Sequence, residues 1–258
     1  MRRGDVRFMS YSEDANYAQT VGRALDIMEL FQGGTRLSLT AVAQRTNMST
    51  TAAFRLLHTL CLRGYLTQLQ DKTYALGDNA IMLGLVGLHE RKIVGAAHGL
   101  MWDWYAQTGH TVAVSIIANQ AAVIVNKIHP FPDEVDMSYL GYPLPLHRGA
   151  SQRVMLAFLP EEERTAYVES LFLTPSAKAE LYAELENIRE RGYDYTAEQV
   201  TKDLWAIAFP IFERSGKLAG CVGTSGYVSE LKRDTIEQRV SQLRPLIARI
   251  QQKMNMID

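Results

Sequence analysis

The sequence predicts an α+β protein in two parts: a small helical domain that carries a β-hairpin, and a larger domain of strands and helices. Two observations predict this division. Three short amphipathic runs and a hairpin pattern occupy residues 20–76. Beyond them, β-rich runs and helical runs share residues 93–258, which is typical of an α+β domain. A chain of 258 residues is long enough to bury two such cores.

The first part of the chain is organised as helices followed by a tight β-turn. Apolar spacing predicts three helices and a hairpin, over residues 20–31, 38–45, 50–63 and 65–76. Ser38 and Ser49 can cap the second and third helices, and the hairpin turns at residues 70–72. Three helices and a hairpin in this order predict a winged helix-turn-helix. We place it at residues 18–77, after a flexible tail of residues 1–17.

The third helix carries the residues that predict DNA binding. Its apolar positions Ala53, Leu57 and Leu60 share one face, and the opposite face holds Arg55 and no acidic residue. Small hydroxyl groups at a helix start can approach a DNA groove closely, and arginine can contact base edges or phosphates. The candidate DNA contacts, which include the hairpin tip, are Ser38, Ser49, Thr50, Thr51, Phe54, Arg55, His58 and Lys72. The alternative is a three-helix domain that binds a protein instead of DNA.

Charge and cysteine content narrow the class of protein. The net charge of −1 argues against indiscriminate nucleic-acid binding. Residues 1–77 hold nine basic and six acidic residues, 9 − 6 = +3, which leaves −1 − 3 = −4 for the remainder. This asymmetry suits a DNA-reading domain beside a domain with another role. Cys61 and Cys221 predict neither a disulfide framework nor a metal site. With no signal-peptide or membrane-span pattern, we expect a cytoplasmic protein and no membrane partner.

The rest of the chain predicts a linker and an α+β domain. Asp78 can cap a linker helix over residues 78–92, whose apolar stripe Ile81, Leu85 and Leu88 can pair with a second subunit. The expected helices after it cover residues 93–108, 149–159, 161–170, 176–191 and a segment from Ser229 onward. The expected strands cover residues 111–118, 121–128, 204–213 and 217–225. Pro245 is expected to kink or divide the last helix.

Several stretches resemble the IclR family of bacterial regulators. They are TVGRALDIMELF (20–31), LSLTAVAQRTNMSTTAAFRLLHTLCLRGYL (37–66), KTYALGDNAIMLG (72–84), PLPLHRGASQRVMLAFLP (143–160) and RGYDYTAEQVTKDLWAIAFPIFERSGKLAGCVGTSGY (191–227). The resemblance implies a GAF-like α/β effector-binding domain at residues 93–258. It also implies homodimers or homotetramers on palindromic operators. Arg153 and Trp205 depart from the family pattern near the implied pocket, so the identity of the ligand is not carried over.

The start of the helix at residues 149–159 predicts a binding site for an anion. Backbone N–H groups at a helix start, here with Ser151 beside them, can hold a carboxylate or a hydroxyl. The resemblance places a small-molecule effector here, a small organic acid or an aromatic compound. The candidate effector contacts are Phe131, Met137, Leu144, His147, Ala150, Ser151, Leu204, Ala206 and Ser225. Taken one at a time, the apolar members of this set are equally well explained as core residues.

The sequence offers little support for catalysis. Residues 223–226 approach the nucleophile-elbow motif, but Tyr227 stands where the motif needs glycine. Phosphate-binding glycine patterns and paired histidines are absent from the sequence, so we expect no cofactor and no metal. We therefore expect a transcriptional regulator that is not an enzyme. The main alternative is an enzyme carrying a DNA-binding appendage, and a third is an architectural DNA binder without a ligand.

Overall fold

The computed structural model describes residues 16–32, 34–129, 140–199, 201–232 and 235–256. The chain divides into two compact units, Met1–Leu88 and His89–Asp258, which we treat separately. Most of the predicted tail, residues 1–15, lies outside the described residues. Among the described residues, no helix is both long enough and apolar enough to cross a lipid bilayer.

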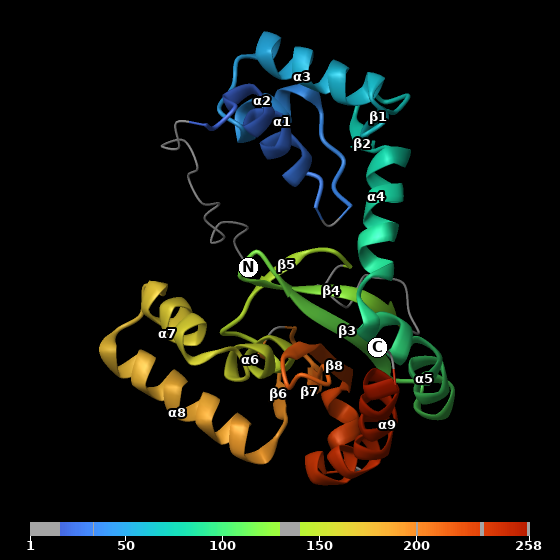
Figure 1. Ribbon diagram of the computed structural model, residues 1–258, viewed down its shortest axis with the longest axis vertical. Helices are drawn as coiled ribbons and strands as arrows, with labels where there is room; N and C mark the ends of the chain where they lie inside the picture. Colours follow the sequence, from blue (N-terminus) through green and yellow to red (C-terminus); the bar gives the residue numbers. More distant parts are fainter. Residues whose placement is uncertain (1–15, 33, 130–139, 200, 233–234, 257–258) are drawn as a thin grey trace. The chain divides into compact units, whose positions relative to one another are not determined.

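The first unit confirms the predicted order of three helices and a hairpin (Figure 1). Its elements are α1 (Gln19–Glu29), α2 (Leu39–Arg45), α3 (Thr50–Leu62), β1 (Leu66–Gln68), β2 (Tyr74–Leu76) and most of α4 (Asp78–His89). Ser38 and Ser49 cap α2 and α3 as predicted, each accepting a hydrogen bond from the backbone N–H three residues later. The apolar faces of the three helices close over a core that includes Ile27, Phe31 and Leu57.

The second unit is built on one antiparallel sheet of six strands, in the order β5-β4-β3-β8-β7-β6. The strands are β3 (Thr111–Ala118), β4 (Ala121–Ile128), β5 (Pro143–Pro145), β6 (Asp194–Ala197), β7 (Leu204–Phe212) and β8 (Leu218–Tyr227). The predicted hairpins β3–β4 and β7–β8 are confirmed and form the centre of the sheet. The two edge strands, β5 and β6, were not predicted.

Helices cover both faces of this sheet (Figure 1). They are α5 (Lys92–Thr108), α6 (Ala150–Ala157), α7 (Glu161–Ser170), α8 (Pro175–Arg191), the 3-10 helix η1 (Val228–Lys232) and α9 (Ile236–Met256). One core lies between the sheet and α5 and α9, and a second lies beneath α6, α7 and α8. The predicted α+β class is confirmed.

The last helix differs from its prediction in two ways. A 3-10 turn occupies the region after Ser229, and α9 begins only at Ile236. Pro245 lies inside α9 without dividing it. Leu243, Leu246 and Ile250 remain buried on both sides of the proline. Burial of this apolar stripe against the sheet offsets the one backbone hydrogen bond that proline removes.

Candidate DNA-binding surface and ligand cavity

The α3 helix presents an open polar face beside the hairpin. Ala53 and Leu57 are completely buried on its inner side, whereas Thr51, Arg55 and His58 are exposed. Within the described chain, no acidic side chain pairs with Arg55. Its guanidinium is therefore available to a phosphate or to a base edge in the major groove.

The remaining predicted DNA contacts lie around this face. Thr50 is exposed in the first turn of α3, and Phe54 is 49% exposed with its ring stacked on His58 at 6.0 Å. An apolar ring on such a surface can contact a thymine methyl group. The hydroxyl oxygens of Ser38 and Ser49 each accept a helix-capping hydrogen bond of 3.2 Å, and each O–H can still donate one hydrogen bond.

The hairpin tip is a turn with Lys72 exposed at its end, as predicted. Lys72 has a φ of 62°, and Asp71 holds the turn by accepting hydrogen bonds from the Thr73 backbone N–H (2.9 Å) and hydroxyl (2.6 Å). These two bonds favour the ionised carboxylate and so lower the pKa of Asp71. An isolated bridge between Leu37 and Tyr74 ties the hairpin back to the start of α2. The wing is thereby fixed to the helices whose face it extends.

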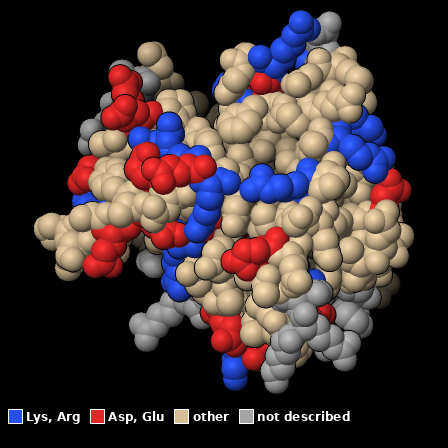
Figure 2. Space-filling model, turned by 90° about the horizontal axis from the view of Figure 1, so that it is seen from below, with Lys and Arg blue, Asp and Glu red and all other residues tan. Residues whose placement is uncertain are grey.

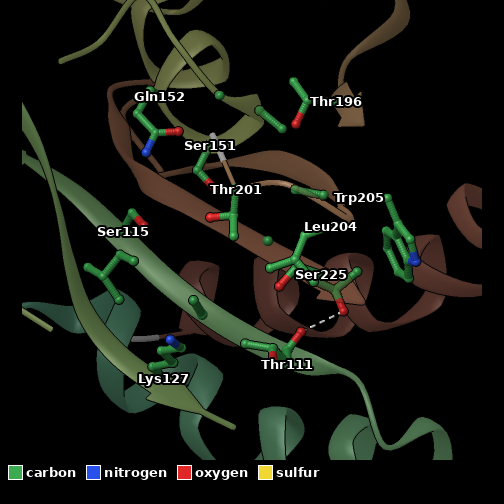
Figure 3. A pocket seen from close by; sticks show the side chains of 17 residues that line it. Thr111, Ser115, Lys127, Ser151, Gln152, Thr196, Thr201, Leu204, Trp205 and Ser225 are labelled. Carbon is green, nitrogen blue, oxygen red and sulfur yellow. Dashed lines mark hydrogen bonds between the residues drawn. The ribbon is translucent and has the colours of Figure 1, made fainter. Parts of the chain in front are cut away.

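The second unit contains a cavity of about 100 Å³ between its sheet and the start of α6 (Figure 3). Side chains from β3, β4, β6, β7 and β8 reach it. Its lining is Thr111, Ala113, Ser115, Ile124, Lys127, Gly149, Ala150, Ser151, Gln152, Thr196, Thr201, Leu204, Trp205, Ala206, Gly223, Thr224 and Ser225. Five of the predicted effector contacts are among these residues: Ala150, Ser151, Leu204, Ala206 and Ser225.

The first turn of α6 faces this cavity with its backbone N–H groups uncapped. Gly149 stands at the cap position with φ 93°, and it supplies no side-chain acceptor. Gly223 on β8 lies so close that a Cβ there would meet the Ser151 hydroxyl at 2.8 Å. Gly223 therefore lets the strand lie close to the start of the helix. Uncapped N–H groups favour an anionic group at this point.

Two other predicted effector contacts, Leu144 and His147, do not line the cavity. Leu144 is buried in the core beneath α6, and His147 hydrogen-bonds through Nδ1 to the Tyr167 hydroxyl at 3.1 Å. That hydroxyl also accepts the Leu146 N–H at 2.7 Å, so the two residues hold the loop before α6 in place. Burial, with Arg148 nearby, lowers the pKa of His147, which stays neutral above mildly acidic pH. Phe131 and Met137 lie outside the described residues.

Sequence reasoning missed most of the polar lining of the cavity: Thr111, Ser115, Lys127 and Thr196 on the strands, Gln152 on α6 and Thr201 before β7. Each is an ordinary polar residue in its own segment, and only the fold places them together. The sequence did contain one signal for part of this lining. Alternate residues of a strand share a face, so Thr111, Ala113 and Ser115 on β3 could have been assigned to the same side of the sheet.

A buried ion-pair cluster fixes α6 to the edge strand β6. Asp194 is completely buried, and the Arg153 guanidinium donates to its two oxygens from Nε at 2.8 Å and from Nη2 at 3.1 Å. Arg191 and the Tyr195 backbone N–H also donate to Asp194. Arg153 lies in α6 one position after Gln152, and Asp194 lies two residues before Thr196. The cluster thus positions two sides of the cavity.

The charged surface around α8 and α9 carries both signs. Figure 2 shows basic and acidic side chains interspersed over the face seen from below in the view of Figure 1. Ion pairs made by α8, such as Lys178–Glu169 (2.8 Å) and Arg191–Glu184 (3.3 Å), balance charge around that helix. Such a mixed face does not present the basic stripe that attracts a phosphate backbone. The open face of α3 is the better candidate for DNA.

Comparison with known proteins identifies relatives over nearly the whole chain. The family model described as "Bacterial transcriptional regulator IclR C-terminal" matches residues 86–251, and "IclR helix-turn-helix domain" matches residues 20–70. The HTH-type transcriptional regulator XynR of Escherichia coli is 28% identical over 221 residues, 83% of this chain and 88% of that protein. The transcriptional repressor IclR of Escherichia coli is 23% identical over 250 residues, 92% of this chain and 90% of that protein.

Solved structures agree on the fold. The Thermotoga maritima IclR is 26% identical, covers 92% of this chain and 99% of its own, and superposes with a TM-score of 0.68. An IclR homolog from Microbacterium hydrocarbonoxydans, complexed with 4-hydroxybenzoate, is 17% identical with a TM-score of 0.79, covering 91% of this chain and 98% of its own.

Proposed function

Because the chain belongs to the IclR family, as a DNA-binding transcriptional regulator controlled by a small molecule, we propose that α3 reads its operator and that the α6 cavity binds its effector. The two functions divide at the linker helix, residues 78–92. The main support for this DNA-binding site is the exposed polar face of α3 beside the β1–β2 hairpin, which forms the wing. A helix with one buried face and one open polar face, flanked by a wing, suits insertion into a major groove.

The cavity at α6 supports the effector site. Its lining combines uncapped backbone N–H groups, several hydroxyl groups and small apolar side chains, which is the usual make-up of a small-ligand site. The relative complexed with 4-hydroxybenzoate is a family member with a small carboxylate bound. An effector changes operator binding only if it prefers one of two arrangements of the protein, by about 1–3 kcal/mol for a useful switch.

Subunit pairing through α4 and α1 is part of the proposal. None of the α4 residues is buried, and Ile81, Met82, Leu83, Leu85 and Val86 are between 52% and 62% exposed. Val21 and Leu25 on α1 are exposed to a similar extent. An apolar surface of this kind marks an interface with another chain. A twofold homodimer, alone or paired into a homotetramer, would read a palindromic operator in the cytoplasm, where bacterial operator DNA lies.

The proposal does not include catalysis. Residues 223–226 run straight through β8 between its partners β3 and β7, whereas a nucleophile elbow lies on a turn from strand to helix. Burial raises the pKa of Cys221 to about 12, so its thiol carries no nucleophilic thiolate at neutral pH. Turnover of a bound carboxylate by the purified protein would contradict this part of the proposal.

A mobility-shift experiment tests the function. The full-length protein is mixed with the DNA upstream of its neighbouring genes, with and without a panel of carboxylates. We expect a specific complex whose affinity changes with one class of carboxylate. Absence of any specific complex, under salt conditions that permit nonspecific binding, would rule out the proposal.

Arg55→Ala is expected to weaken specific operator binding by about 1–3 kcal/mol, because it removes a bidentate donor from the groove-facing side of α3. Fluorescence anisotropy with a labelled operator measures the change. Arg249→Ala is the control. It removes the same positive charge from an exposed position on α9, which belongs to the second unit and not to the proposed DNA-binding surface. Equal operator affinity for Arg55→Ala and Arg249→Ala would remove Arg55 from the site.

The double substitution Ser151→Leu and Ala206→Trp is expected to fill the cavity while leaving effector-independent operator binding unchanged. Both residues line the cavity, and added side-chain volume there excludes a ligand. Thermal shift with carboxylates measures the loss, because a ligand stabilises only a protein that binds it. A normal ligand-induced shift in the double variant would place the effector elsewhere.

A further inference from the structure

The start of α4 is hydrogen-bonded to the end of α3. Three successive carbonyl groups that follow α3, those of Arg63, Gly64 and Tyr65, accept bonds from this start. Asn79 donates two of them, from its side-chain Nδ2 to the Arg63 oxygen at 2.6 Å and from its backbone N–H to the Gly64 oxygen at 3.0 Å. The Gly77 N–H donates the third, to the Tyr65 oxygen at 2.8 Å. We call these three bonds the α3–α4 clamp.

Two glycines allow the two segments of the clamp to approach each other. Gly64 has a φ of 70°, and a Cβ added at Gly77 would lie 2.4 Å from the Gly64 oxygen. A side chain at residue 77 would therefore force the segments apart. Glycine is also the residue whose backbone rotates most freely. The glycines that permit this contact thus leave a joint that can rotate, and the Asn79 side-chain bond opposes that rotation.

The clamp determines the direction of α4 relative to α3. Residues 81–87 are all exposed, so none of the described residues of the first unit packs over them. Figure 1 shows α4 leaving the end of α3 in a direction of its own. Because the winged domain holds α4 only by its first turn, the angle between the two helices depends on the bonds made there.

A small rotation at the clamp becomes a large displacement at the far end of α4. The helix has 12 residues, which at 1.5 Å per residue gives a length of about 18 Å. A rotation of about 10° at one end moves the other end by about 3 Å, close to the roughly 3.4 Å between neighbouring base pairs. In a dimer that pairs through α4, the angle at the clamp therefore sets the separation of the two α3 helices.

We infer that Asn79 is a positioning residue for operator recognition. Its side-chain bond to the Arg63 carbonyl fixes the angle between α3 and α4, and this angle selects the spacing of the two half-sites. The inference rests on the proposed function, because it takes α3 as the helix that reads DNA and α4 as the subunit interface. Half-site spacing then adds a second criterion to the base contacts that α3 makes.

The dependence of operator affinity on half-site spacing tests the inference. Labelled duplexes carry the two half-sites with the preferred spacer, or with a spacer one base pair shorter or longer. One base pair moves a half-site by about 3.4 Å and turns it by about 35° around the duplex. For the full-length wild type, fluorescence anisotropy is expected to show a loss of affinity of about tenfold or more for either change, because a rigid dimer cannot reach both half-sites.

Two substitutions remove the side-chain bond in different ways. Asn79→Ala deletes the amide, and Asn79→Asp keeps its shape but replaces the donor by an acceptor. We expect each to bind the preferred spacing about threefold or more weakly, because a freer joint loses more conformational freedom on binding. We also expect each to lose only about threefold or less for a one-base-pair change, because a freer joint reaches other spacings.

Two controls separate positioning from a folding defect. Affinity for a duplex with a single half-site is expected to stay at the wild-type value in both Asn79 variants, because α3 itself is unchanged. Gln107→Ala removes an exposed side-chain amide from α5 in the second unit, and it is expected to keep the wild-type dependence on spacing.

A dependence on spacing as steep as that of the wild type, in either Asn79 variant, would overturn the inference. An equal loss of affinity at every spacing and on the single half-site would also overturn it, because a folding defect has that effect. A wild type that accepts every spacing equally would overturn it while leaving α3 as the helix that reads DNA. Failure of the wild type to bind the operator or the single half-site would instead contradict the proposed function.

Discussion

Replacement of Ile81 and Leu85 by glutamate is expected to separate the proposed dimer and to lower operator affinity about a hundredfold or more, the usual loss when two linked binding sites become independent. Both side chains are more than half exposed on α4, one helical turn apart. In a dimer they would be buried against the partner, where two carboxylates are costly to desolvate. Sedimentation velocity measures the oligomeric state, and anisotropy with a labelled operator measures the affinity.

Phe172→Glu provides the matched control for this experiment. Phe172 is 95% exposed between α7 and α8, so the substitution adds one carboxylate, against two in the α4 variant, at a more accessible apolar position. We expect it to leave the dimer and the operator affinity unchanged. A double α4 variant that remains dimeric would show that the apolar face of α4 is not the subunit interface.

Asp194→Asn is expected to lower the free energy of unfolding of the effector domain by about 3 kcal/mol or more, because removal of one member of a buried ion pair leaves the other charge uncompensated. Arg153 and Arg191 both donate to this fully buried carboxylate, and each would keep only the partly exposed Glu184 as a charged partner, at 3.7 Å and 3.3 Å. Urea denaturation followed by tryptophan fluorescence measures the change. All three tryptophans lie beyond residue 92, so the signal reports on this domain.

The control for this prediction is Glu184→Gln. Glu184 is 3.3 Å from Arg191, but its side chain is 36% exposed, and a pair of this kind contributes at most about 1 kcal/mol. A loss for Asp194→Asn no larger than that for Glu184→Gln would mean that the cluster does not hold α6 and β6 together.

The periodicity of the sequence predicted the central elements because their burial is regular. The alternating β3–β4 and β7–β8 hairpins and the one-sided helix α3 were predicted in place. The two edge strands were missed for physical reasons. β5 is three residues long with proline at both ends, and β6 begins with the buried charge of Asp194. Neither resembles an isolated strand, and each forms only because a longer neighbour supplies its hydrogen bonds.

The site was less predictable than the fold. Ala150, Ser151 and Ala206 were identified from the family resemblance and do line the cavity. His147 lies close to them in sequence, but a hydrogen bond turns it toward Tyr167. Thr196 had no local signal, because its importance depends on the ion pair that brings β6 against α6. Contacts of this kind follow from strand order, which local periodicity does not encode.

One experiment tests most directly whether α3 determines the DNA sequence that the protein binds. The wild-type protein and Arg55→Ala each select binding sites, in parallel, from a pool of random duplex DNA. The account predicts that the wild type selects a palindrome and that Arg55→Ala relaxes the choice of base at one position in each half-site. Recovery of the same sequence with the same stringency by both proteins, or of no preferred sequence by the wild type, would contradict it.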